Sequence, residues 1–360
     1  MTSIRRPRVG VLGAGQLALM LAEAAPAVHA DILCAGQPGD CAEQAAPVLP
    51  VDLSNPHAVA EFARHVDLLT IESENIDAHV LHGLPHFPNA RAIATAQDRL
   101  LEKHFFVDCG LEVAPFAPVN DLVSLHAAIR EVGLPAILKT RRLGYDGKGQ
   151  VRLTSFDQAA DAWAQLNAPC ILEGLVAFDT EVSLLAARNR SGELAFYPLT
   201  ENFHHDGILR ISRAPTHPEL QSLAEQHLTH LLERLDYIGI LAVEFFVRGS
   251  HLLANEMAPR VHNSGHWTIE GSDTSQFENH LRAILGLPLG STASRPTVMF
   301  NCIGAMCPRE ETAQFVSIAR HDYGKSPRPG RKVGHLTVPA SDVAAIAALE
   351  FLFGTRNKSI

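Results

Sequence analysis

The sequence predicts a protein of mixed α/β and α+β class, with a parallel sheet at the N-terminus, an antiparallel sheet region in the middle and a small β-rich cap at the C-terminus. Two patterns predict this class. Over residues 8–71, buried strand patterns alternate with helical patterns, which is typical of an open, mostly parallel sheet. Over residues 151–188, strand patterns follow one another with few helical periods between them, which favours antiparallel pairing.

Size and composition limit the classes of protein that fit. The 360 residues are enough for two or three domains. We expect an N-terminal domain over 1–94, a central domain over 95–290 with a lid at about 135–172, and a C-terminal domain over 291–360. The net charge of −9 argues against nucleic acid as a partner, and no run reaches the roughly 18 apolar residues of a membrane span. The six cysteines form no CxxC pair, so we expect free thiols in a cytoplasmic protein.

The elements can be placed in order along the chain. A strand at 8–12 leads through Gly13-Ala14-Gly15 into a helix over 16–25. A helix at 56–65 has Ser54 or Asn55 as its N-cap and Pro56 in its first turn. Beyond it we expect helices and strands at these ranges: strand 66–71, helix 97–109, strands 151–153, 170–173 and 181–188, helix 218–235, helix 275–285 ending at Gly286, and helix 341–351.

Gly13, Gly15 and Ala18 also fit a dinucleotide-binding fingerprint after the first strand. The acidic residue that this fingerprint needs about 20 residues later is not clear in this sequence. Because a short glycine motif is weak on its own, an NAD-dependent dehydrogenase stays open as an alternative that NADH binding would test.

A hairpin carries the most specific geometry in the sequence. Strands at 238–247 and 252–257 flank a turn, and a turn centred on Ser250 places Glu244 directly opposite Glu256 on one face. Facing carboxylates repel each other unless a cation lies between them, and their hard oxygens suit magnesium bound with nucleotide phosphates. The alternative is two unrelated surface glutamates, although the apolar LAVEFFV around Glu244 is a poor setting for a solvated charge.

Three further segments could bind anions. The sequence GYDGKGQ at 144–150 follows Lys139, and its glycines let backbone amides approach phosphate oxygens, although it is no Walker A motif. Residues 259–267, PRVHNSGHW, offer donors for a carboxylate or bicarbonate. Residues 325–332 hold four cations that could bind a ribose phosphate. The alternatives are a flexible hairpin, a polar surface loop and a solvated basic turn.

Together these motifs resemble the 5-(carboxyamino)imidazole ribonucleotide synthase family of ATP-grasp ligases. The resemblance runs from about Val9 to Val338 and is carried by GYDGKGQ at 144–150, FYPLTEN at 196–202, DGILR at 206–210, NEMAPRVHNSGHW at 255–267 and RPGRKVGHL at 328–336. It implies an ATP-grasp fold with an N-terminal Rossmann-like domain and a small β-rich C-terminal cap. It also implies ATP and Mg²⁺ as cofactors and a homodimer.

The resemblance implies roles for residues at matching positions. For ATP these are Arg99, Lys139, Gly144, Tyr145, Asp146, Gly147, Lys148, Gly149, Gln150, Glu173, Gly174, Leu175, Val176, Glu181, His204, Asn255 and Glu256. Glu244 and Glu256 would bind the metal, and Arg260, His262 and Asn263 would bind bicarbonate. The substrate nucleotide would contact Gln16, Glu74, Tyr145, Asp146, Arg210, Arg331 and Lys332. Asp146, Arg260 and Lys332 are the implied catalytic residues.

The implied reaction is the ATP-dependent carboxylation of aminoimidazole ribonucleotide in purine biosynthesis. Phosphoryl transfer converts bicarbonate, a poor acylating agent, to carboxyphosphate, which the exocyclic amine then attacks. Magnesium and Lys139 would offset the charge on the transferring phosphoryl, and Asp146 would take the amine proton. Loop closure would exclude water from the carboxyphosphate.

The sequence departs from the family pattern at three positions. Ala18 and Leu19 stand where glycine and arginine are expected, and Leu143 replaces a glycine before GYDG, which would stiffen the loop. Another ATP-grasp carboxylate–amine ligase and a non-catalytic nucleotide-binding protein therefore stay open as alternatives. Stimulation of ATP hydrolysis by aminoimidazole ribonucleotide and bicarbonate would distinguish them.

Overall fold

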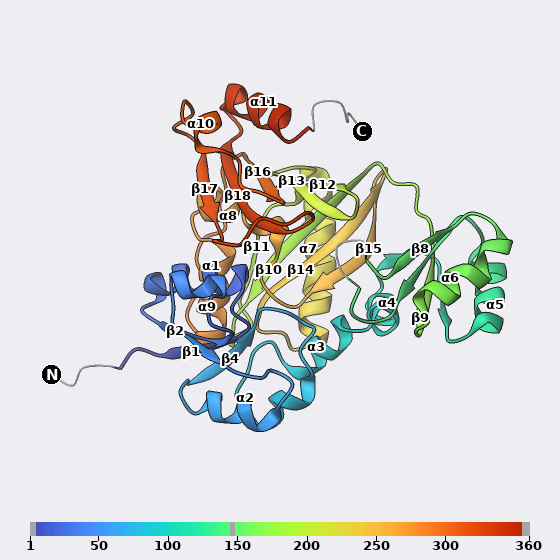
Figure 1. Cartoon of the computed structure of the whole chain (residues 1–360), viewed down its shortest axis with the longest axis horizontal. Helices are drawn as coiled ribbons and strands as arrows, with labels where there is room; N and C mark the ends of the chain where they lie inside the picture. Colours follow the sequence, from blue (N-terminus) through green and yellow to red (C-terminus); the bar gives the residue numbers. More distant parts are fainter. Residues whose placement is uncertain (1–4, 145–147, 355–360) are drawn as a thin grey trace.

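The computed structural model describes residues 5–144 and 148–354, and this part of the chain contains three sheets (Figure 1). The N-terminal sheet is parallel, in the order β3-β2-β1-β4. Its strands are β1 (Arg8–Leu12), β2 (Asp31–Gly36), β3 (Val48–Pro50) and β4 (Leu68–Ile71). Helices α1 (Gln16–Ala24) and α2 (Pro56–Ala63) connect them, and α3 (Ala90–Ala96) and α4 (Arg99–Asp108) lead into the central part. The predicted parallel sheet is confirmed.

A ten-stranded sheet forms the centre of the molecule and continues into the C-terminal part. Its order is β17-β18-β16-β13-β12-β10-β14-β15-β5, and β11 pairs with β10. The strands are β5 (Glu112–Val113), β10 (Thr180–Arg188), β11 (Leu194–Phe196), β12 (Thr200–His205), β13 (Ile208–Ala214), β14 (Gly239–Arg248), β15 (His251–Ala258), β16 (Thr297–Ile303), β17 (Ala319–Asp322) and β18 (Lys332–Pro339). The accompanying helices are α7 (Pro218–Arg234), α8 (Thr268–Gly271), α9 (Gln276–Leu285), α10 (Arg309–Thr312) and α11 (Val343–Leu352). The β-rich C-terminal cap is confirmed, and the β13–β16 pairing joins it to the central sheet.

A separate antiparallel sheet in the order β6-β9-β7-β8 projects to one side of the molecule (Figure 1). Its strands are β6 (Phe116–Val119), β7 (Ala136–Thr140), β8 (Gln150–Leu153) and β9 (Cys170–Gly174). Helices α5 (Leu122–Val132) and α6 (Ala159–Leu166) pack on it around Leu138 and Leu172. We call residues 116–174 the lid sheet.

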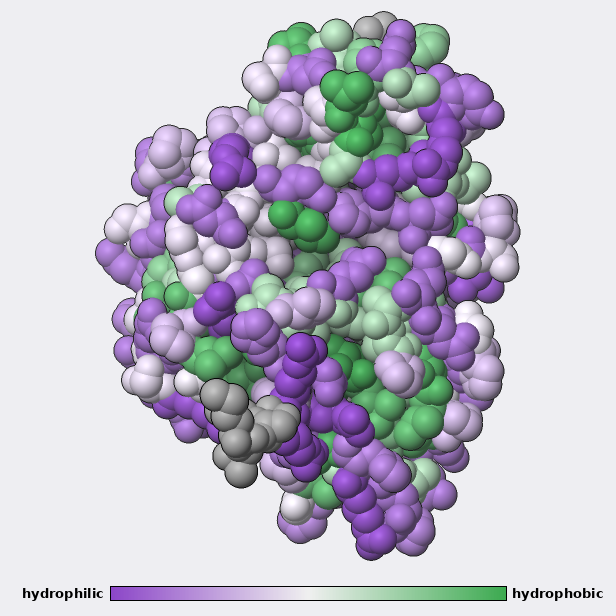
Figure 2. Space-filling view, turned by 90° about the vertical axis from the view of Figure 1, so that its left-hand side faces the viewer, coloured by the Kyte–Doolittle hydropathy of each residue, from purple (hydrophilic) through white to green (hydrophobic). Residues whose placement is uncertain are grey.

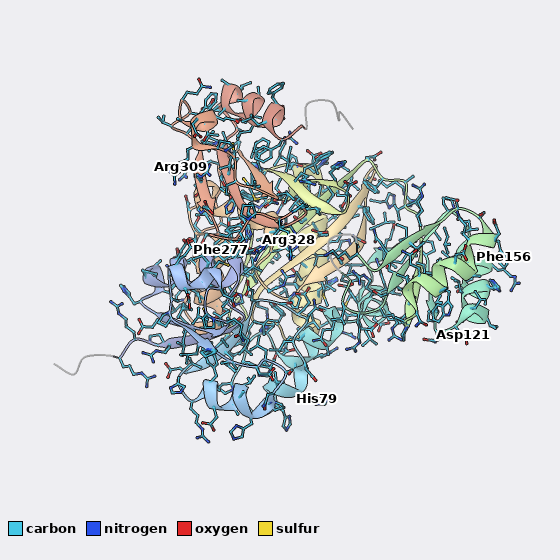
Figure 3. The ribbon with its side chains drawn as sticks, in the orientation of Figure 1. His79, Asp121, Phe156, Phe277, Arg309 and Arg328 are labelled. Carbon is cyan, nitrogen blue, oxygen red and sulfur yellow. The ribbon has the colours of Figure 1, made fainter. Side chains whose placement is uncertain are left out.

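The helix α6 corrects the expectation of few helical periods between the strands of 151–188, and α5, which lies before that range, was not predicted. Asp121 and Ser124 form a reciprocal capping box that begins α5, a strong local start signal that the strand-based interpretation overlooked. In α6, Ala159 and Ala162 are buried, and such small residues give a weak hydrophobic period. Figure 3 shows Asp121 and Phe156 at the outer end of the lid sheet.

The N-terminal and central parts share a core. Leu17 and Met20 of α1 belong to one buried cluster with Phe277 and Leu281 of α9 (Figure 3). The helix α9 begins at the Ser275 cap and ends at Gly286 in the left-handed conformation, as predicted. This packing places the first strand–turn–helix beside the central sheet.

No helix in the described part of the chain combines the length and the apolar character that a membrane crossing requires. The face in Figure 2 mixes hydrophilic residues with separate small hydrophobic areas. Such a mixture is ordinary for a protein surface.

Candidate functional site

Glu244 of β14 and Glu256 of β15 are paired directly opposite each other. The hairpin turn is Gly249-Ser250, because Arg248 pairs with His251, so the turn is not centred on Ser250. A bulge between the pairs Phe245–Ala254 and Glu244–Glu256 adds one residue, Asn255, to β15 and restores the expected pairing.

The two carboxylates have different surroundings. The side chain of Glu244 is 12% exposed, whereas Glu256 is exposed to the cavity described below. Burial raises the pKa of Glu244 to about 7; the charge of His204 opposes this rise, and the charge of Glu256 adds to it. A carboxylate pair with this repulsion fits a divalent cation between its oxygens.

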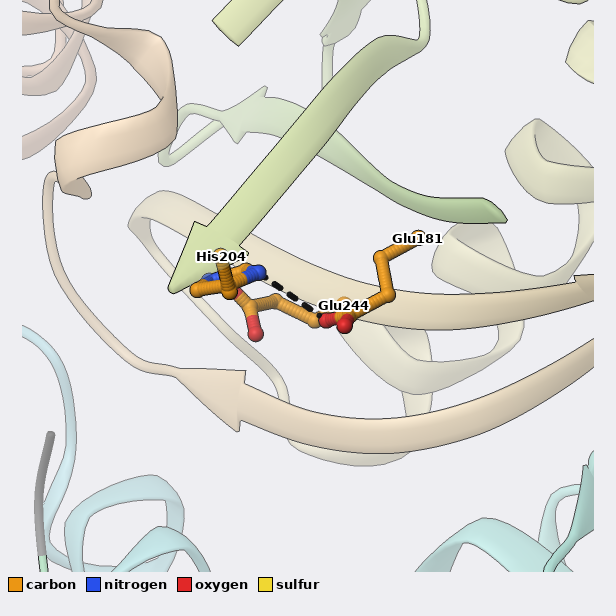
Figure 4. Close-up of side chains that lie close together, drawn as sticks. All are labelled: Glu181, His204 and Glu244. Atoms are coloured by element: carbon orange, nitrogen blue, oxygen red, sulfur yellow. Dashed lines mark ion pairs between the residues drawn. The ribbon is translucent and has the colours of Figure 1, made fainter. Parts of the chain in front are cut away.

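Glu181 and His204 complete an acidic cluster with Glu244, drawn in Figure 4. One ligand atom from each of the three lies within 4.8 Å of the others, and His204 Nδ1 is 3.0 Å from Glu181 Oε2. Burial opposes protonation of His204, but Glu181 and Glu244 outweigh it and raise its pKa to about 9. A protonated imidazole cannot ligate a metal, so at neutral pH His204 acts here as a cation that offsets the two carboxylates.

A cavity of about 830 Å³ lies between the lid sheet and the central sheet. The predicted residues that line it are Gln16, Glu74, Arg99, Lys139, Gly144, Lys148, Gln150, Glu173, Gly174, Leu175, Val176, Glu181, His204, Glu244, Asn255, Glu256, Arg260, His262, Asn263 and Lys332. Gly149, Arg210 and Arg331 are not among its lining residues. Tyr145, Asp146 and Gly147 lie outside the described residues.

The cationic side chains on the lid side of the cavity are held by a buried carboxylate and by backbone carbonyls. Lys139 Nζ is 2.9 Å from Glu173 Oε2, and Lys103 Nζ is 3.7 Å from the same atom. Burial works against ionisation of Glu173, but the two lysines lower its pKa to about 2. Arg99 donates to the carbonyls of Thr140 (3.1 Å) and Gly144 (2.9 Å), which ties the start of the glycine loop to α4.

The predicted bicarbonate residues converge in one corner. Arg260 Nη2 donates to Glu74 Oε1 at 3.1 Å, so Arg260 is paired with a residue that we assigned to the substrate nucleotide. Burial and the charge of Arg260 lower the pKa of His262 well below its usual range, so this ring is neutral. Both polar atoms of the Asn263 side chain are buried and have no hydrogen-bond partner among the described residues. A buried amide without partners is ready to bind a polar ligand.

The sequence interpretation missed Glu72, which directly follows β4. Its carboxylate accepts hydrogen bonds from the amides of Gly15 (2.6 Å) and Leu17 (3.1 Å) at the start of α1. This is the place where a dinucleotide-binding protein binds pyrophosphate. The acid occupies it, which argues against the dehydrogenase alternative. A signal existed: Glu72 ends a parallel strand next to β1.

Three domain families match the chain in order. They are the ribonucleotide synthetase preATP-grasp domain at residues 7–97, the ATP-grasp domain at 104–277 and the phosphoribosylaminoimidazole carboxylase C-terminal domain at 297–349. The N5-carboxyaminoimidazole ribonucleotide synthase of Pseudomonas aeruginosa is 46% identical over 95% of this chain and 97% of its own length. The chain belongs to the N5-carboxyaminoimidazole ribonucleotide synthase family.

Solved structures of N5-carboxyaminoimidazole ribonucleotide synthases share the whole fold. The Thermus thermophilus synthetase is 47% identical, with a TM-score of 0.91 over 96% of this chain and 98% of that one. An Aspergillus clavatus synthase in complex with ADP and 5-aminoimidazole ribonucleotide is 28% identical, with a TM-score of 0.87 over 97% and 98% of the two chains.

Two departures from the family pattern have a structural basis. Ala18 and Leu19 are almost fully buried and pack in the core shared by α1 and α9, so this turn of α1 presents no cation to the cavity. Leu143 is 72% exposed and has a φ of 64°, the left-handed conformation that suits the glycine expected from the resemblance.

The basic segment divides between two surroundings. Lys325 donates to Gln16 Oε1 and lies 5.6 Å from the centre of the Tyr323 ring, and Lys332 lines the cavity. Arg331 donates to the carbonyl of Ser326 at 3.2 Å, away from the cavity lining. The structure therefore brings Lys325, one of the four cations of the predicted phosphate-binding segment, beside the predicted substrate residue Gln16.

Proposed function

We propose that the chain catalyses the ATP-dependent carboxylation of 5-aminoimidazole ribonucleotide with bicarbonate to N5-carboxyaminoimidazole ribonucleotide, in purine biosynthesis. Family membership makes it an ADP-forming ATP-grasp ligase. The observation that carries the proposal is that Glu244 and Glu256 face each other on the wall of one cavity that Lys139, Asn263 and Lys332 also line. No feature of the described residues favours a different carboxylate–amine ligase.

ATP would lie between the lid sheet and the central sheet. Relatives from Staphylococcus aureus and A. clavatus were solved with ADP or ATP. Glu244 and Glu256 would hold Mg²⁺, which when bound offsets negative charge on the phosphates. Lys139 would leave Glu173 in part to contact a phosphate, since its ammonium has three donors.

Bicarbonate would bind where the amide of Asn263 meets the guanidinium of Arg260. Asn263 contributes a donor and an acceptor that are both buried and free of partners among the described residues. Arg260 is kept charged and oriented by Glu74. Phosphorylation of bicarbonate here gives carboxyphosphate, whose phosphate is a much better leaving group than hydroxide.

The acceptor nucleotide would lie at the side of the cavity that Gln16, Glu74 and Lys332 line, with its phosphate near the basic segment. The A. clavatus synthase was solved in complex with ADP and this nucleotide, which supports the binding of both by one chain of this family. Its amine attacks the carbonyl carbon of carboxyphosphate, phosphate leaves, and Asp146 takes the amine proton. Arg210 and Arg331 do not line the cavity, and their contact with the nucleotide stays a prediction.

We also propose a cytoplasmic homodimer. All six cysteines are free thiols in the structure, as suits a reducing compartment. Light scattering after gel filtration tests the dimer, which a mass near the 39.0 kDa of one chain would contradict.

The deciding experiment measures ADP formation with bicarbonate and aminoimidazole ribonucleotide, added singly and together, alongside transfer of ¹⁴C from bicarbonate. We expect ADP and acid-labile ¹⁴C product in equal amounts only when both are present. ADP formation that does not increase when aminoimidazole ribonucleotide is added would indicate another ligase. ATP binding without turnover would indicate a non-catalytic nucleotide-binding protein. Asn263→Leu should raise the KM for bicarbonate about tenfold or more, since one lost hydrogen bond in a buried site weakens binding to this degree, with little change in the KM for ATP.

A further inference from the structure

The position of Glu256 depends on one extra residue in β15. The hairpin runs in a regular register from the turn to the pair Phe245–Ala254, and Asn255 is then inserted before the pair Glu244–Glu256. Without the insertion, Glu244 would face Asn255, and Glu256 would point to the other side of the sheet. The approach of the two carboxylates therefore requires that this bulge persists.

Two consecutive residues of α4 hold β15 on both sides of Glu256. Lys103 Nζ donates to the carbonyls of Ala254 (3.2 Å) and Asn255 (2.8 Å). Glu102 Oε1 accepts a hydrogen bond from the backbone amide of Met257 at 2.6 Å. The backbone atoms that they bind belong to the two residues before Glu256 and to the one after it.

Both side chains are buried, where a charged group loses its hydration. Glu102 and Lys103 are 2% and 1% exposed, and burying such groups is unfavourable unless hydrogen bonds compensate. A bulge leaves backbone groups without ladder partners, and these two side chains satisfy the ones around Asn255. The lysine also lies 3.7 Å from Glu173, which pairs with Lys139, so the bulge and the phosphate-facing lysine share one network.

We propose that Glu102 and Lys103 are positioning residues, which fix the bulge in β15 and thereby hold Glu256 opposite Glu244. They act through the backbone of β15. Glu102 also borders the cavity, and metal-free ADP binding tests whether it contacts the nucleotide directly. The inference rests on the proposed function in one respect, that Glu244 and Glu256 bind the divalent ion of the nucleotide.

The test compares pairs of variants of the full-length chain. Glu102→Gln keeps an acceptor for the Met257 amide, and Glu102→Leu removes it at similar size. Lys103→Met removes the donors to β15. Arg188→Met is the matched control, because Arg188 also donates from a half-buried position to a backbone carbonyl, that of Tyr237 at 2.8 Å, but away from the cavity.

The readouts are Mn²⁺ binding by electron paramagnetic resonance in the presence of ADP, and ADP binding without metal. We expect Glu102→Leu and Lys103→Met to weaken Mn²⁺ binding by about 10- to 100-fold, the usual loss when a group supporting a metal ligand is removed. Metal-free ADP binding should change far less in Glu102→Leu. Glu102→Gln and Arg188→Met should bind Mn²⁺ as the wild type does.

Four outcomes have a defined meaning for the proposal. Folded variants with wild-type Mn²⁺ affinity would overturn the proposal, as would an equal loss of metal-free ADP binding in Glu102→Leu, which indicates general damage. Should Lys103→Met not fold, the Glu102 pair alone decides, because neither of its substitutions buries an extra charge. A wild-type protein that binds no Mn²⁺ with ADP would instead refute the proposed metal site itself.

Discussion

The carboxylate of Glu72 lies 2.6 Å from the backbone nitrogen of Gly15 and takes the place at the start of α1 that a phosphate occupies in dinucleotide-binding proteins. A Cβ on Gly15 would overlap Glu72 Oε1. The glycines of the first turn are therefore explained by the close approach of an acid from β4, with no need of a bound dinucleotide.

This relationship predicts a non-additive pair of substitutions. Gly15 has a φ of −82°, which alanine adopts freely, so Gly15→Ala should destabilise the fold through its clash with Glu72. We expect a loss of about 2 kcal/mol, the usual cost of overpacking. In a Glu72→Ala background the same substitution should cost much less. Urea denaturation of the four proteins measures this, and additive effects would show that a clash with Glu72 is not the source of the cost.

Glu244→Gln should separate stability from activity. The pKa of Glu244 is raised to about 7 in the fold, so ionisation destabilises the ligand-free protein, most fully above pH 7. At pH 8 the amide should increase the free energy of unfolding by about 1–3 kcal/mol while turnover falls below detection. Glu256→Gln should also abolish turnover, but it should stabilise the fold less, because the charge of Glu256 is only one of the causes that raise the pKa of Glu244. Near-normal turnover in either variant would contradict the metal assignment.

Leu143→Gly should stabilise the protein. The left-handed conformation of Leu143, with a φ of 64°, costs about 1 kcal/mol for a residue with a Cβ, and glycine avoids this cost. Part of the gain is lost because glycine is more flexible in the unfolded chain, so we expect about 0.5 kcal/mol. Leu143→Ala is the control, since it keeps the Cβ and should give no gain. Equal unfolding midpoints for the two variants would argue against backbone strain.

The proton on His204 should make stability depend on pH. Its pKa is about 9 in the fold against 6.5 in a free histidine, so its contribution is fully present below pH 6.5 and is lost as the pH rises through 9. Between pH 6 and pH 9.5 the ligand-free wild type should lose more stability than His204→Asn. Urea denaturation at these pH values checks the difference, and an imidazole that titrates near 6.5 by NMR would disprove it.

Much of the site could be predicted because its signals are local. The helix over 275–285 was correct to within a residue, since Ser275 and Gly286 mark its ends in the sequence. The predicted pairing of Glu244 with Glu256 is also correct, but for a different reason. The turn lies between Gly249 and Ser250 and is not centred on Ser250, and the bulge in β15 compensates for this shift. The alternation of apolar and polar residues in a strand does not reveal a bulge. The extra residue in β15 is accommodated by side chains of α4, which is distant in the sequence.

The parts that sequence could not supply depend on contacts between distant segments. Glu102 and Lys103 look like ordinary charged residues of a helix until α4 packs against β15. Likewise, Lys325 and Arg331 are equivalent in a basic run, and only the fold brings Lys325 to Gln16 and turns Arg331 away. The cluster of Glu181 with His204 arises from two strands that pair only in the folded sheet.

The ladder that joins β13 to β16 has a consequence for how the cavity can change shape. Lys332 in β18 and Glu244 in β14 are members of one hydrogen-bonded sheet, so their separation is set by backbone pairing. Lys139 belongs to the lid sheet, whose described strands share no ladder with the large one. The spacing between the proposed seat of the acceptor nucleotide and Glu244 is thus set by strand pairing, whereas no shared ladder fixes the spacing between Lys139 and Glu244.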